Sequence, residues 1–172
     1  MKIEELVDST KSMLFEMVAP IEKPILQGIS TNQIRKIELN LGFFFSDEVI
    51  QWYNFCNGAL TSPGGLYGFE NTYIDIANVY SCYPFWIQNK WLPLAGDGHG
   101  NHYICLLDPN SKYFSHVFFV DTSHPNELCY AVGSNVWYFF FFLFRNELGE
   151  KRWPFDMDYI SSIDPNFIHV ES

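Results

Sequence analysis

The sequence predicts an α+β fold, with N-terminal helices, a central mostly antiparallel or mixed sheet, and a C-terminal helix packed on that sheet. Three observations predict this class. Apolar residues recur every three or four positions in the first third of the chain, which is typical of amphipathic helices. Short apolar runs bounded by turn residues follow in the middle, and an aromatic helical pattern comes last. With 172 residues, the chain is expected to form a single domain, whose core covers about 30–148.

The first two helices have clear boundaries. Apolar spacings of three and four predict an N-terminal helix over residues 3–18, which Pro20 ends. The second helix begins after Ser30, because Gln33 completes a capping box three residues later. It ends at Gly42, where a glycine can adopt the left-handed conformation that closes many helices.

A third helix and a less regular region follow. Ser46 is the expected cap of the third helix, and Asn57-Gly58 closes it. Residues 66–69 are a short strand candidate. Residues 73–80 fit either a strand or a helical turn, and the sequence leaves both open.

Four short apolar segments are expected to form most of the sheet. They cover residues 91–95, 102–107, 117–120 and 128–132. The glycine-rich turn of residues 96–101 separates the first two, so these segments are expected to pair as a hairpin.

The last helix is unusually aromatic. Ser134 is its expected cap, and Gly149 ends it. Its main apolar stripe consists of Trp137, Phe140, Phe141, Phe144 and Leu148. Phe139 and Phe142 point in other directions, so this helix must be covered on more than one side. Residues 150–172 form a C-terminal tail with two short apolar stretches.

Composition excludes two broad classes of protein. The chain has 20 acidic and 10 basic residues, a net charge of −10, and 19% aromatic residues. Disordered chains have few aromatic residues and many charges, so a folded domain is expected. A nucleic-acid binder needs clustered lysine and arginine residues, which this sequence lacks, so no nucleic-acid partner is expected.

The sequence also indicates a compartment. Acidic residues near the N-terminus interrupt any secretory signal, and the longest apolar run, residues 136–144, is too short to cross a membrane. We therefore expect a cytoplasmic protein without a membrane partner. No CxxC or CxxH pair is present, so no zinc site is expected. The four cysteines are expected to be reduced and buried: Cys56, Cys82, Cys105 and Cys129.

Two features of the glycine-rich turn could suggest a ligand. Gly96, Gly98 and Gly100 suggest a phosphate loop, but β-forming segments flank them and no lysine follows closely, so a hairpin turn is expected. His99 and His102, together with an aspartate, could suggest a metal site. A spacing of three places the two histidines on opposite faces of a strand, so no metal or cofactor is expected.

No catalytic signature is present. A Ser-His-Asp triad is assembled in space, and a single sequence neither reveals nor excludes one. The GxSxG elbow and the calcium-loop pattern are both absent. We therefore expect no enzymatic activity, and an enzyme with a pocket near Trp91 and Asp97 is the weaker alternative.

The distribution of charge is more informative. No lysine or arginine lies between Lys36 and Lys90, and only Lys112 lies between Lys90 and Phe144. The middle of the chain should therefore present a negative surface. This surface either keeps the protein soluble or attracts a basic protein partner.

The residues around the glycine-rich turn resemble the central signature of the SUKH superfamily, the Smi/Knr-like domain. The signature reads LP-I-A-x-D-x-x-G-N-x-Y and leads into a strand, as residues 91–106 do here. Further matches with the family pattern lie at Ile34 to Gly42, Asn57-Gly58, Val117 to Asp121, Ala131 and Ser134. The usual Leu-Pro after Leu41-Gly42 is replaced by Phe44-Phe45, and the tail has no counterpart.

This resemblance implies function by binding. Bacterial SUKH proteins neutralise polymorphic toxins, many of them nucleases or deaminases, and a yeast member regulates cell-wall synthesis. The expected function is therefore an immunity protein that binds a basic toxin domain, and the alternative is a regulatory scaffold.

We expect contact residues at acidic or aromatic positions in turns and at strand ends. Trp91 could instead belong to the core, and Asn101 could stabilise its own turn. The expected set is Glu70, Asp75, Trp91, Asp97, Asn101, Asp121 and Glu127.

Overall fold

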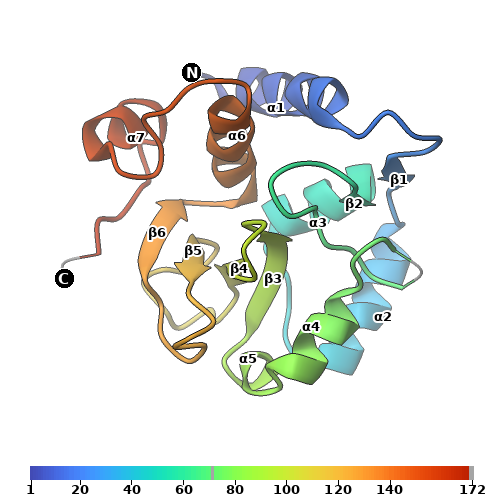
Figure 1. Ribbon diagram of the computed structural model, residues 1–172. Helices are drawn as coiled ribbons and strands as arrows, with labels where there is room; N and C mark the ends of the chain where they lie inside the picture. Colours follow the sequence, from blue (N-terminus) through green and yellow to red (C-terminus); the bar gives the residue numbers. More distant parts are fainter. Residues whose placement is uncertain (71, 171–172) are drawn as a thin grey trace.

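A four-stranded antiparallel sheet occupies the middle of the molecule, and helices cover it (Figure 1). The computed structural model describes residues 1–70 and 72–170. The strand order is β3-β4-β5-β6. The strands are β3 (Trp91–Gly96), β4 (His102–Leu106), β5 (Val117–Val120) and β6 (Tyr130–Gly133). The predicted α+β class and antiparallel sheet are confirmed.

A second, two-stranded sheet precedes the first in sequence. It pairs β1 (Ile25–Gln27) with β2 (Cys56–Ala59) in antiparallel orientation. Single bridges from Leu66 to Ala59 and to Ala95 connect this pair to β3. The predicted strand at residues 66–69 is therefore reduced to isolated bridges.

Seven helices surround these sheets in the described part of the chain. They are α1 (Ile3–Met17), α2 (Thr31–Leu41), α3 (Asp47–Phe55), α4 (Ile76–Cys82), α5 (Phe85–Gln88), α6 (Val136–Glu147) and α7 (Met157–Ile163). α1 packs against α6, and α2 lies beside α3. α4 lies close to α2 in Figure 1, and residues of both helices line one cavity.

The predicted caps of α2 and α3 are confirmed. Ser30 Oγ accepts a hydrogen bond from the Gln33 amide, and the Gln33 side chain accepts one from the Ser30 amide at 2.8 Å. Gly42 has a φ of 82°, the left-handed conformation expected at a helix end. Ser46 accepts a bond from the Val49 amide. α3 ends at Phe55, before Asn57-Gly58, because β2 already includes those residues.

The starts of two helices, α4 and α6, add to the prediction. The first settles an open alternative, and the second differs from the expected cap. Of the ambiguous residues 73–80, residues 76–80 are helical and belong to α4, and the Asp75 side chain caps that helix by accepting a bond from the Ala77 amide at 2.9 Å. Asn135, not Ser134, caps α6, since its side chain accepts bonds from the amides of Trp137 and Tyr138. Ser134 instead donates to Asp164 through both its amide and its hydroxyl.

The core is dominated by aromatic rings on α6. All residues from Val136 to Phe144 are buried. Trp52 of α3 stacks on Phe140 with ring centroids 4.0 Å apart, and Tyr103 of the sheet contacts Phe139 at 4.9 Å. The predicted coverage of this helix on several sides is therefore confirmed, because α1, α3 and the sheet each contact it.

The C-terminal tail completes this coverage. Tyr159 of α7 packs edge-on against Phe142, with ring centroids 5.8 Å apart. The buried Trp153 donates its indole N–H to the Val132 carbonyl at 3.2 Å. The prediction assigned no helix to this tail, and α7 is therefore an addition to it.

The expectation that all four cysteines are buried is wrong for two of them. Cys56 and Cys105 are buried, whereas Cys82 and Cys129 are exposed. Burial raises the pKa of Cys56 to about 12, so this thiol stays protonated at neutral pH. Cys82 ends the short helix α4 and Cys129 lies in the β5–β6 loop, where neighbouring residues do not cover them.

Candidate functional site

Two turns meet at one end of the four-stranded sheet, and the first connects β3 to β4. The Asp97 carboxylate organises this turn by accepting hydrogen bonds from the amides of His99 (2.8 Å) and Asn101 (3.0 Å). It accepts a third bond from the Asn101 side-chain amide at 2.8 Å. Asp97 and Asn101 therefore shape the turn through their side chains, as such residues commonly do.

Asn101 also joins this turn to the loop after β5. Its side-chain oxygen accepts a hydrogen bond from the Thr122 amide at 3.0 Å, and the Thr122 hydroxyl donates to the Gly100 carbonyl at 3.2 Å. The expected turn-stabilising role of Asn101 is thus present in the structure. Its side chain links two segments that are 21 residues apart.

The loop after β5 contributes two more acidic residues. Asp121 accepts bonds from the Ser123 hydroxyl and amide at 2.7 and 2.8 Å, and Glu127 is exposed in the same loop. We call Asp97, Asp121 and Glu127 the acidic sheet end. The structure therefore brings four of the seven expected contact residues, these three and Asn101, to one end of the sheet.

Hydrogen bonds lower the pKa of two of these carboxylates. Burial raises the pKa of Asp97, but the bonds from Asn101 and His99 outweigh burial and hold this pKa below its usual value. Bonds from Ser123 likewise lower the pKa of Asp121. Asp97 and Asp121 are therefore negatively charged at neutral pH.

We expect the stability contributed by Asp97 to disappear in acid. Because its folded pKa lies below its unfolded pKa, the contribution is present above about pH 4 and is lost as pH falls through the folded pKa. Urea midpoints of the native chain and Asp97→Asn, measured from pH 7 to pH 2.5, should converge at low pH. A constant difference between the two would contradict this assignment.

Gly98 of the first turn permits close backbone packing. A side chain at this position would place its Cβ 2.6 Å from the Pro63 carbonyl oxygen, and Gly98 has a φ of 81°. Strand β4 follows this turn directly, with no helix N-terminus that could hold a phosphate. The predicted hairpin turn is confirmed.

His102 points into the protein, away from the exposed His99. Its Nδ1 lies 2.7 Å from the Tyr67 hydroxyl, and the rings of Tyr83 and Trp86 pack against it. Burial lowers the pKa of His102, although Asp97 partly opposes this effect. Within the described residues, no group of three His, Cys, Asp or Glu side chains could hold a metal ion.

Trp91 belongs to the core. Its exposed fraction is 8%, and its ring lies edge-on to Phe85 with centroids 5.3 Å apart. Its carbonyl accepts a hydrogen bond from the Tyr80 hydroxyl at 2.9 Å. This residue can therefore contribute little area to a partner surface.

Glu70 and Asp75, the two remaining expected residues, lie beside a groove between α2 and α4. This α2–α4 groove contains two adjoining cavities of about 220 and 150 Å³, which share Ile37, Asn40, Phe69 and Glu70. Asp75 lines the smaller cavity. None of the expected contact residues lies on α2. The half-buried pair Ile37 and Leu41, one helical turn apart, is the signal that could have indicated the groove.

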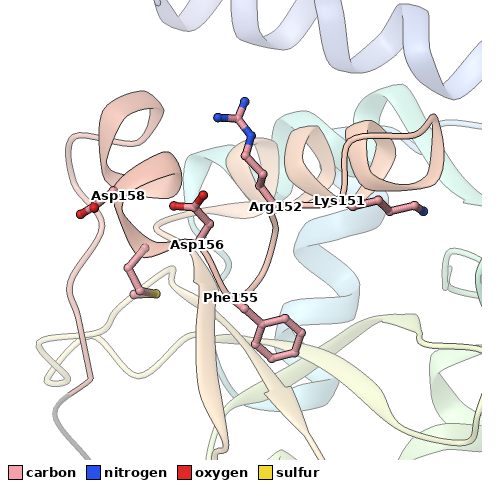
Figure 2. A pocket seen from close by; sticks show the side chains of 6 residues that line it. Lys151, Arg152, Phe155, Asp156 and Asp158 are labelled. Carbon is pink, nitrogen blue, oxygen red and sulfur yellow. The ribbon is translucent and has the colours of Figure 1, made fainter.

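A further hollow, of about 560 Å³, lies on the C-terminal tail near α7 (Figure 2). Its labelled side chains diverge: Arg152 and Phe155 point in opposite directions, and Lys151 points away from Asp156. Convergent polar groups are characteristic of small-molecule sites. This hollow therefore offers no catalytic arrangement.

A model of the SMI1/KNR4 family (SUKH-1) matches residues 28–141. The chain belongs to this family. The part that matches the SUKH-1 family includes the acidic sheet end and the α2–α4 groove, whereas α1, α7 and the hollow of Figure 2 lie outside it. No curated protein matches the chain. None of the described helices has the length and apolar character needed to span a membrane.

Proposed function

We propose that this chain is a non-enzymatic protein-binding domain that acts as an immunity protein. It neutralises a cognate toxin, of the nuclease or deaminase type. It binds this toxin in the cytoplasm of the toxin-producing cell. The observation that carries the proposal is membership of the SUKH-1 family, together with the toxin-neutralising role known for bacterial SUKH proteins.

Electrostatics supports a basic partner. The chain has a net charge of −10, and three carboxylates gather at the acidic sheet end. A nuclease holds its substrate in a cleft lined by basic residues, which attract phosphates. An acidic surface can occupy such a cleft, or speed the encounter with it.

The hydrogen bonds within the acidic sheet end favour a role in protein binding over a role in catalysis. Asp97 and Asp121 are ionised and are held by hydrogen bonds from their own turns. A general acid or base at neutral pH needs a pKa near 7, whereas the pKa values of these carboxylates are lowered. Fixed carboxylates of this kind form a preorganised contact surface.

Neutralising the acidic sheet end should slow association with the toxin. The test uses the protein encoded by the gene adjacent to this one. In the Asp97→Asn/Asp121→Asn/Glu127→Gln variant, the association rate at low salt should fall about tenfold, because electrostatic steering accelerates encounter by this order or more. Stopped-flow kinetics at several salt concentrations should also show a weaker salt dependence.

A matched variant separates local from global charge. Asp8→Asn/Glu16→Gln/Glu22→Gln removes the same number of charges from α1 and the turn after it. The association rate of this variant should change much less. Equal slowing by both variants would contradict a role for the acidic sheet end. A wild-type chain that binds no product of the adjacent gene would favour the regulatory scaffold over the immunity protein.

A further inference from the structure

We propose that the smaller cavity of the α2–α4 groove receives an arginine side chain of the protein partner. This inference deepens the proposed function, because it rests on the partner being basic. Apolar residues of two helices and two carboxylates meet at this cavity of about 150 Å³. The lining of this cavity includes Ile37, Leu41, Ile76, Tyr80, Glu70 and Asp75.

The wall of the cavity suits the aliphatic part of a long side chain. Ile37 and Leu41 of α2 are only half-buried, although they lie on the inward stripe of their helix. Ile76 and Tyr80 of α4 form the opposite wall and are almost fully buried. Since the Tyr80 hydroxyl donates to the Trp91 carbonyl at 2.9 Å, its ring is held in place. The wall is therefore preformed.

The two carboxylates supply the charge. One Asp75 oxygen accepts the capping bond from Ala77, and no described residue donates a hydrogen bond to the other oxygen. The Glu70 side chain makes no hydrogen bond or ion pair with the described residues, and its backbone has a φ of 56°. Non-glycine residues seldom adopt this left-handed conformation, which here fixes where the Glu70 side chain leaves the backbone.

Arginine fits this combination better than lysine does. The guanidinium group is planar, weakly hydrated and carries five donors, so it can stack on aromatic rings while it pairs with carboxylates. Phe69 and Tyr80 supply aromatic rings in the lining of the cavity. The lysine ammonium is a strongly hydrated point charge, which loses more hydration on entering such a site.

Lys36 should have the opposite effect on arginine binding from that of the two carboxylates. This residue of α2 lines the adjoining cavity of about 220 Å³, together with Glu70. Its positive charge should repel an incoming arginine. Removing this charge should therefore strengthen binding, whereas removing the carboxylates should weaken it.

The experiment is an NMR titration of the full chain with the blocked tripeptide acetyl-Gly-Arg-Gly-amide. The citrulline analogue, which has nearly the same shape but no charge, and the lysine analogue serve as comparisons. Backbone amide signals of Glu70, Asp75 and Ala77 should shift with the arginine peptide. Binding should be at least tenfold weaker for citrulline and several-fold weaker for lysine.

Isosteric variants then assign the site. Glu70→Gln/Asp75→Asn should weaken binding of the arginine peptide at least tenfold, and the introduced asparagine can still cap α4 through its side-chain oxygen. Lys36→Gln should strengthen binding about twofold or more. Unchanged affinity in both variants, equal binding of arginine and citrulline, or shifts confined to the acidic sheet end would overturn the proposal.

These outcomes are separable from failure of the proposed function. If the wild-type chain binds the basic toxin and the Glu70→Gln/Asp75→Asn variant binds it equally well, only the arginine subsite is wrong. If the wild-type chain binds no basic partner while the arginine peptide still occupies the cavity, the immunity function is wrong and the subsite stands.

Discussion

Replacing Trp52 by alanine should lower the free energy of unfolding by about 3–5 kcal/mol, the usual cost of truncating a fully buried tryptophan. The side chain is 1% exposed, and its ring stacks on Phe140 at 4.0 Å. It also contacts Trp137 edge-on at 5.4 Å. The alanine variant therefore leaves a cavity at the junction of α3 and α6, where neighbouring rings cannot collapse without losing their own contacts. Urea unfolding followed by far-UV circular dichroism measures the change.

Trp52→Phe is the matched control. It keeps an aromatic ring against Phe140 and removes less volume, so it should cost clearly less than the alanine variant. An alanine variant that loses less than about 1 kcal/mol would show that α3 and α6 are not packed as described.

Glu38→Ala should lower the free energy of unfolding by about 2–4 kcal/mol, because it leaves a buried amide without a partner and removes a charged hydrogen bond. The Glu38 carboxylate is 1% exposed, and it accepts a bond from the Phe45 amide at 2.7 Å. It also pairs with the Arg35 guanidinium at 2.7 Å. Glu38 therefore holds the turn between α2 and α3, and thermal and urea unfolding should both report its loss.

Two further variants separate the contributions to this effect. Glu38→Gln can still accept the bond from Phe45, so it should cost less than Glu38→Ala. Arg35→Ala leaves the buried Glu38 carboxylate without its counter-charge, so it should cost more than the about 0–1 kcal/mol of a fully exposed ion pair, although the Arg35 side chain itself is 51% exposed. A larger loss for Arg35→Ala than for Glu38→Ala would assign the stability to the ion pair and contradict this account.

Local signals explain why much of the fold could be predicted. Ser30 caps the start of α2 together with Gln33, three residues away, and Gly42 caps its end through a bond to the Glu38 carbonyl, four residues away, so both capping roles can be read directly from the sequence. The hairpin of β3 and β4 is local in the same sense. Apolar residues lie on several faces of α6, and this pattern also predicted that several elements would cover the helix.

Other elements depend on contacts that are distant in sequence. Strand β1 has three residues and exists only because β2 pairs with it. Ser134 has the composition of a helix cap, but it binds Asp164, which lies 30 residues away, and Asn135 takes the capping role. Short elements of this kind carry too little periodicity for prediction.

The candidate site shows the same division. The sequence predicted Asp97, Asn101, Asp121 and Glu127 only as residues of turns or strand ends, and the register of β3, β4 and β5 shows that they share one end of the sheet. The α2–α4 groove could not be predicted, because it depends on how α4 lies beside α2. Trp91 was ambiguous, since a tryptophan that opens an apolar strand can serve either the interior or a contact surface.

Because the C-terminal tail packs on α6, it limits how far the chain can be truncated. The family match stops at residue 141, within α6, while Trp153 and Tyr159 still lie against the rings of Phe139 and Phe142. Asp164 fastens the far end of the same segment through its two hydrogen bonds with Ser134. A chain shortened to the family limits would expose phenylalanine faces to water and favour self-association. The tail therefore shields one of the most hydrophobic helices of the protein.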